Sequence, residues 1–181
     1  MTALRFFMLL ALVIWIGGII YFAAVVAPVV FSGILPTRHM SGMIVSRVLT
    51  TLHWMGIVCG GVFLVLSVME SYYAGAGWQA TALRNVFVFG MIVATLFSQL
   101  VVAVKMEALR AQMGEIDSVA ATDPRRIAFD RLHQWSTSLE VLVLLLGLAA
   151  LWMVARHWSI PFSTAGSAQN LPPRSSSAFH S

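Results

Sequence analysis

Four long apolar runs constrain this chain more than any other feature of its sequence. They cover residues 6–34, 52–68, 86–104 and 139–155, and the only charged side chain inside them is Glu140. A helix needs roughly 20 apolar residues to cross a hydrocarbon core. Because lipid offers no hydrogen-bond partners to the backbone, such runs cross it as helices. The sequence therefore predicts an all-α fold: an integral membrane four-helix bundle made of two helical hairpins.

Composition excludes the main soluble alternatives. Hydrophobic residues make up 59% of the chain and charged residues 10%, against roughly 45–50% and about 25% in soluble proteins. The net charge of +4 could suggest a nucleic-acid partner. However, the basic residues stand at the ends of the apolar runs, which is typical of membrane proteins. We therefore expect the lipid bilayer as a partner, and no nucleic acid. The single cysteine, Cys59, rules out an internal disulfide.

The ends of the last two helices can be predicted from capping residues. Asp123 followed by Pro124 is a typical helix start, and no helix breaker follows before His157. The third helix continues past Lys105 to Gly114, a typical glycine stop. We therefore predict that the third and fourth helices extend beyond the bilayer as a projecting hairpin.

Two parts of the chain differ sharply in composition. Residues 1–158 contain all four runs and form the predicted transmembrane domain. Residues 159–181 are rich in Ser, Ala and Pro and contain a single charged residue. Such a segment cannot bury enough apolar surface to fold, so we predict a disordered tail.

Basic residues predict the orientation. Four spans put both termini on one face, with four basic residues: Arg5, Arg84, Arg156 and Arg174. The opposite face has seven: Arg38, Arg47, Lys105, Arg110, Arg125, Arg126 and Arg131. Basic residues favour the cytoplasm. We therefore predict a cell inner-membrane protein with both termini outside and the 105–131 hairpin in the cytoplasm.

Small residues and a proline predict local features of the first two helices. Gly56-x-x-x-Gly60 is a small-residue helix-contact motif, and we expect Gly17 and Gly18 to serve the same purpose in the first helix. Pro28 removes a backbone donor, so a distortion is expected near the end of that helix.

Polar groups at membrane depth are functional candidates because they are costly there. His53 begins the second run and His133 precedes the fourth, so both lie towards the hairpin face. Glu140 is on the same face of its helix as His133 and roughly 10 Å deeper. The predicted polar cluster in this inner half of the bundle adds four more residues: Arg47, Ser98, Gln99 and Arg131.

Four interpretations of this cluster are open. His53, His133 and Glu140 have the ligand types of a transition-metal site. The two histidines could instead be axial ligands of a haem. Histidine and glutamate could also relay protons or gate a small polar substrate. Finally, the cluster could be a hydrogen-bonded lock between helices without any cofactor.

The two hairpins share a short pattern. Leu52-His53-Trp54 and Leu132-His133-Gln134-Trp135 occupy matching positions in the second helix of each hairpin. This indicates a diverged duplication with parallel halves, an arrangement used by some transporters.

Three segments carry a family resemblance: residues 15–31 (WIGGIIYFAAVVAPVVF), 105–117 (KMEALRAQMGEID) and 131–148 (RLHQWSTSLEVLVLLLGL). They resemble the transmembrane-protein-205-like family, small multi-pass proteins whose bacterial members are described as a domain of unknown function. The resemblance covers about residues 4–156 and implies a four-helix membrane domain without an established reaction. The Trp-x-Gly-Gly element at Trp15 is also similar to one in the copper-resistance D membrane family, although no histidine stands just before it here.

No catalytic signature is present: the chain has no phosphate-binding glycine loop, no Gly-x-Ser-x-Gly and no His-Glu-x-x-His. We therefore expect no enzyme activity. The leading prediction is small-solute or metal transport, or haem or metal handling, through the polar cluster. The alternative is a structural or assembly module that presents the charged hairpin to a partner, either a second copy or another membrane protein.

Overall fold

The structure is a computed structural model that describes residues 2–33, 35–74, 78–114 and 118–156. It contains the following elements: α1 (Thr2–Tyr21), a π-helical turn (Phe22–Val26), α2 (Ala27–Val30), α3 (Arg38–Ala74), α4 (Trp78–Phe97), a second π-helical turn (Ser98–Val102), α5 (Ala103–Met113) and α6 (Pro124–Arg156). The predicted tail at 159–181 lies outside the described residues. Within them four helices are long and apolar enough to cross a membrane. The predicted all-α four-helix membrane bundle is therefore confirmed.

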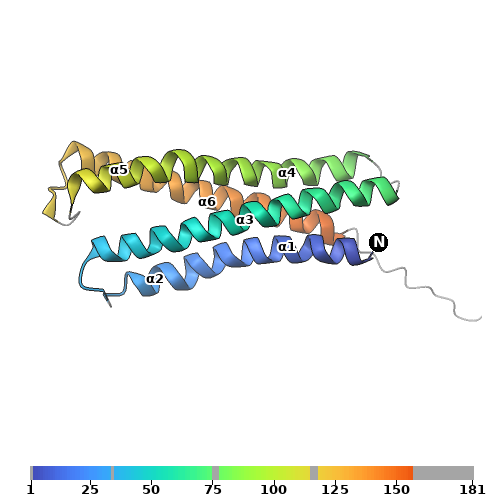
Figure 1. Cartoon of the computed structure of the whole chain (residues 1–181), viewed down its shortest axis with the longest axis horizontal. Helices are drawn as coiled ribbons and strands as arrows, with labels where there is room; N and C mark the ends of the chain where they lie inside the picture. Colours follow the sequence, from blue (N-terminus) through green and yellow to red (C-terminus); the bar gives the residue numbers. More distant parts are fainter. Residues whose placement is uncertain (1, 34, 75–77, 115–117, 157–181) are drawn as a thin grey trace, which may run out of the picture.

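Each long helix runs antiparallel to the next one along the chain (Figure 1). Helix α1 packs against α3 and α6, and α4 packs against the same two helices. The N-terminal end of α1 and the C-terminal end of α6 lie together at one end of the bundle, and the α5–α6 connection lies at the other (Figure 1). The helices thus enclose one core, whose most deeply buried side chains include Met8, Leu12, Phe63 and Met91.

The helices extend well past the apolar runs. Helix α3 begins at Arg38 rather than near Leu52, so it accompanies α5 along part of the hairpin. A Cβ built on Gly42 of α3 would lie 3.4 Å from Nη2 of Arg110 on α5. The α5–α6 hairpin is therefore supported by the first hairpin. The third and fourth helices were expected to project alone, but α3 extends beside them.

A π-helical turn interrupts the first helix of each hairpin. The first, Phe22–Val26, immediately precedes the turn that contains Pro28. Proline lacks the N–H that would continue the α-helical pattern, and a wider turn accommodates this loss. The second π-helical turn, Ser98–Val102, contains two of the predicted polar residues. Its equivalent place in the other hairpin agrees with the parallel duplication that the sequence suggests.

Small residues let Trp15 enter the core. Its side chain is only 1% exposed, and it lies in a notch formed by Gly56 and Gly60. A Cβ on these glycines would lie 2.2 Å and 2.7 Å from the indole ring. Gly18 also packs closely, since its Cβ would lie 2.6 Å from a leucine of α3. Gly17 differs from this expectation: nothing lies within 4 Å of its Cβ position, so it is not a packing glycine in the described bundle.

Candidate functional site

The central polar cluster joins three helical segments. His53 comes from α3, Gln99 from the second π-helical turn and Glu140 from α6. Nδ1 of His53 lies 2.9 Å from Oε1 of Gln99, and Nε2 of the same ring contacts Oε1 of Glu140. The His53 side chain is 4% exposed and that of Glu140 is 18% exposed. The three residues were expected in the inner half of the bundle from residue counting, and hydrogen bonds join them in the structure.

The hydrogen bonds continue from Gln99 back to α3. Nε2 of Gln99 donates to Oγ1 of Thr50 over 3.3 Å, and this hydroxyl donates to the carbonyl of Ser46 over 2.9 Å. Because the Ser46 carbonyl can only accept, the Thr50 hydroxyl must accept from the Gln99 amide. The amide oxygen of Gln99 is then the acceptor that faces His53, so Nδ1 carries a proton.

The other ring nitrogen shares a proton with Glu140. A contact between Nε2 of His53 and a carboxyl oxygen needs one hydrogen between them. That proton sits either on the imidazole, giving a cation beside a carboxylate, or on the carboxyl group, giving two neutral groups. In both arrangements the pair is neutral as a whole and holds one proton that it can release. Burial favours such a neutral arrangement over an isolated charge.

The remaining predicted site residues lie apart from this cluster. His133, Arg131 and Arg47 are exposed. Ser98 is buried, at 2% exposed, but within the described residues its hydroxyl is not hydrogen-bonded to the cluster. His133 shares a helical face with Glu140, yet seven residues separate the two by roughly 10 Å along α6. Shared depth and face are therefore not enough to bring His133 to His53.

This separation weakens the metal and haem interpretations. No group of three or more His, Cys, Asp or Glu side chains that could hold a metal occurs in the described part of the chain. Both ring nitrogens of His53 already have hydrogen-bond partners. His133 is exposed and lies roughly 10 Å along α6 from Glu140, the residue that His53 contacts. The two histidines therefore do not meet at one site. The arrangement can hold a proton more readily than a cofactor.

A second cluster lies at the end of the bundle where α1 begins and α6 ends (Figure 1), and sequence reasoning missed it. Glu70 of α3 is 1% exposed and contacts two arginines. Nε of Arg5 lies 2.5 Å from its Oε1, and Nη2 of Arg84 lies 2.6 Å from its Oε2. Arg84 also donates to Oγ of Ser67 over 2.9 Å, and that hydroxyl donates to Oδ1 of Asn85 over 2.6 Å. This network links α1, α3 and α4.

The sequence did contain a signal for this second cluster. Arg5, Glu70 and Arg84 each stand just outside an apolar run, at the bundle end where α1 begins and α6 ends (Figure 1). Arg5 and Arg84 were considered only as positive charges that set the orientation in the membrane. The same comparison of depths that suggested His53 and Glu140 would have placed them together with Glu70.

The start of α6 is capped as predicted. The backbone N–H of Arg125 donates to Oδ1 of Asp123 over 2.8 Å, and Nη2 of Arg125 lies 2.8 Å from Oδ2. These side-chain and backbone hydrogen bonds from Arg125 lower the pKa of Asp123 to about 2. Nη1 of Arg125 also donates to the Gln112 carbonyl over 3.5 Å, which ties α6 to the end of α5.

Comparison with known proteins gives one result. A family model described as Domain of unknown function (DUF4149) matches residues 10–115, which is more than half of the chain. No curated protein and no solved structure matches it. The matched region includes His53 and Gln99, and Glu140 lies beyond it. The resemblances to the transmembrane-protein-205-like and copper-resistance D families stay predictions.

Proposed function

The chain belongs to the family described as Domain of unknown function (DUF4149), and we propose that it takes up and releases protons within the membrane at His53 and Glu140. The observation that carries this proposal is the contact of Nε2 of His53 with Glu140, which requires one shared proton. The role extends the relay interpretation: the pair provides a proton-binding step on a path that carries protons across the membrane.

Loss of the shared proton has a structural consequence. Hydrogen bonding to Gln99 keeps the other proton on Nδ1, so a deprotonated pair turns the lone pair of Nε2 towards a carboxylate. Two acceptors in contact repel each other, and each is then a buried polar group without its partner. Proton release therefore loosens α3 from α6, whereas proton binding joins them.

The surroundings of the pair suit such a change. The second π-helical turn supplies Gln99, and π-helical turns are frequent at functional sites. The groups hydrogen-bonded to the imidazole besides Glu140 are neutral, namely Gln99 and through it Thr50. Glu140 is the more exposed partner, at 18% against 4% for His53.

Reconstituted protein tests the proposal. In liposomes with an imposed pH gradient and an internal pH-sensitive dye, we expect proton flux above that of protein-free liposomes. Glu140→Gln and His53→Gln should each abolish the flux. Glu107→Gln is the matched control, because this glutamate is 67% exposed and lies outside the cluster. Absence of flux in the native protein, or flux that survives both substitutions, would remove the relay.

The second candidate is a structural or assembly module, in which the His53 cluster serves only as a hydrogen-bonded lock between helices. The hydrogen bonds of Arg125 to Asp123 and to the Gln112 carbonyl favour such a module, because they give the hairpin an ordered end that a second copy or another membrane protein could bind. Under this candidate the native protein conducts no protons, and Glu140→Gln lowers its stability. Neither candidate requires enzyme activity, and we propose none.

Charge supports the proposed orientation. We propose that the protein lies in the cell inner membrane, with the 105–131 hairpin in the cytoplasm and both termini outside. The support is the larger number of basic residues on the hairpin side. A reporter fused after Ser181 that is active only in the cytoplasm would contradict this orientation.

A further inference from the structure

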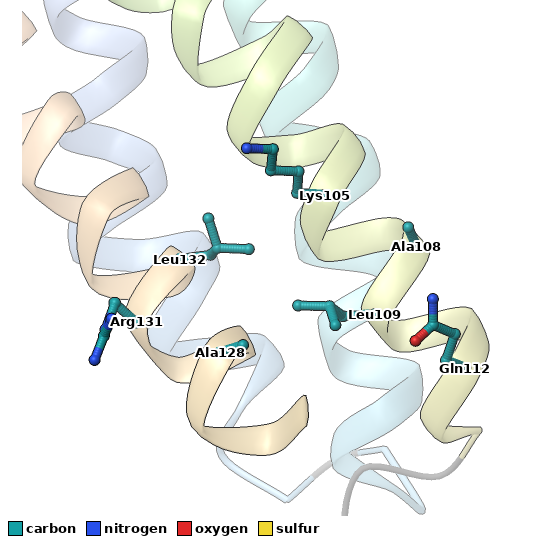
Figure 2. Close-up of a pocket in the computed structure, with 7 residues that line it drawn as sticks. All are labelled: Lys105, Ala108, Leu109, Gln112, Ala128, Arg131 and Leu132. Atoms are coloured by element: carbon teal, nitrogen blue, oxygen red, sulfur yellow. The ribbon is translucent and has the colours of Figure 1, made fainter. Parts of the chain in front are cut away.

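An open groove of about 460 Å³ lies between α5 and α6, at the hairpin end of the bundle. Figure 2 shows the seven residues that line it. Four of them are apolar, and these four are called the floor of the groove: Ala108, Leu109, Ala128 and Leu132. Leu109 points from α5 towards α6 and Leu132 points back towards α5 (Figure 2). Polar side chains, including two cations, stand around this floor.

The two cations are Lys105 and Arg131. Lys105 points towards α6, and Arg131 lies on the outer side of α6 (Figure 2). Within the described residues neither has an ion-pair partner. Arg125 on the same hairpin differs, because it is paired with Asp123. Asp130 is next to Arg131 in the sequence, but adjacent helical residues do not face each other.

Counted along α5, the groove begins where the third apolar run ends and continues away from the hydrocarbon. Lys105 marks the end of the third apolar run, and the groove extends from there along α5 to Gln112, roughly 10 Å at the helical rise. The headgroup layer begins where the hydrocarbon ends and is several ångströms thick. Apolar surface beside unpaired cations at this depth is complementary to one abundant kind of molecule: a lipid with an anionic headgroup.

We propose that the α5–α6 groove is a binding site for an anionic phospholipid of the leaflet on the hairpin side. The phosphate contacts Lys105, and Arg131 adds its charge at the outer edge. The glycerol and first acyl carbons cover the floor around Leu109 and Leu132. The lipid thereby fills the space between the two helices that form the projecting hairpin. This site is separate from the proton-binding pair of the proposed function.

Lipid binding to the full chain in detergent tests the proposal. The probes are phosphatidylglycerol and phosphatidylcholine with identical acyl chains, and binding is measured by native mass spectrometry. We expect phosphatidylglycerol to bind more tightly. A juxtamembrane cation contributes about five-fold in affinity, so Lys105→Gln with Arg131→Gln should weaken binding by about 25-fold. Arg47→Gln is the matched control, since Arg47 is an exposed basic residue on α3 outside the groove.

Two further measurements separate the groove from general charge attraction. Ala128→Phe fills the floor at an exposed position and keeps both cations, so it should also weaken phosphatidylglycerol binding. Equal binding of the two lipids, a loss of about five-fold in Arg47→Gln, or unchanged binding in Ala128→Phe would each overturn the proposal. Displacement of the lipid by the same concentration of inorganic phosphate would also overturn it, because the site would then bind a free anion.

Discussion

The notch around Trp15 gives a sharp prediction for Gly56→Ala. The added Cβ would lie 2.2 Å, 2.4 Å and 2.7 Å from Nε1, Cε2 and Cδ1 of the indole, whereas ordinary contact begins at 3.4 Å. The ring is rigid and 1% exposed, so it cannot move aside without disturbing the core. Overpacking of this kind costs about 1–3 kcal/mol.

Gly61→Ala is the matched control on the same helix, because nothing lies within 4 Å of its Cβ position. Alanine gains up to about 1 kcal/mol over glycine in a helix, and both variants share this gain. The difference in unfolding free energy between Gly56→Ala and Gly61→Ala therefore isolates the clash, and we expect about 1–3 kcal/mol. Denaturant unfolding in detergent micelles, followed by circular dichroism, measures it.

A double-mutant cycle identifies the cause. In a Trp15→Leu background the indole is absent, so the difference between the two alanine variants should become small. Equal stability of Gly56→Ala and Gly61→Ala, or a difference that persists without the indole, would refute the packing argument. If Gly56→Ala instead changed the oligomeric state and left the stability of the monomer unchanged, the glycine motif would serve as a dimer face.

Three other predictions concern charged side chains. Glu70→Gln leaves Arg5 and Arg84 near each other without their shared carboxylate, and we expect a loss of about 3 kcal/mol in unfolding free energy, measured in the same micelles. Glu140→Gln should keep the helical content but remove the pH dependence of α3–α6 separation, measured between spin labels on the two helices; an unchanged pH response would contradict the proton-binding pair. Asp123 has a folded pKa of about 2, below the ordinary aspartate value of 3.8, so its stabilising effect is present above about pH 4 and is lost as the pH falls through about 2. Asp123→Asn should therefore be less stable than the native protein at neutral pH and equally stable at the acid end, and a constant difference across this range would contradict the assignment.

Part of the candidate site could be predicted because depth along a membrane helix follows from counting residues. His53, Gln99 and Glu140 were expected near one another for this reason, and they form one hydrogen-bonded cluster. Counting does not fix how each helix is rotated or what covers it at each level. His133 was therefore expected in the cluster although it is exposed.

The same limit explains the missed second cluster. Glu70, Arg5 and Arg84 satisfy one another inside the bundle, so α3 could continue as a helix beyond the end of its apolar run. Charged residues at the ends of apolar runs were taken as signs of the membrane boundary. A carboxylate held between two guanidinium groups can lie inside a bundle, because its partners replace the water that it loses.

The sequence by itself determined the fold class and the cap at Asp123. Long uncharged runs admit only helices in lipid, and a capping side chain acts on its own neighbouring backbone. Only the tertiary structure decided which faces meet, including the Trp15 notch, the exposure of His133 and the Glu70 cluster. The physical reason is that lipid and protein interior are equally apolar, so hydrophobicity does not distinguish the face of a membrane helix that is buried from the face that meets lipid.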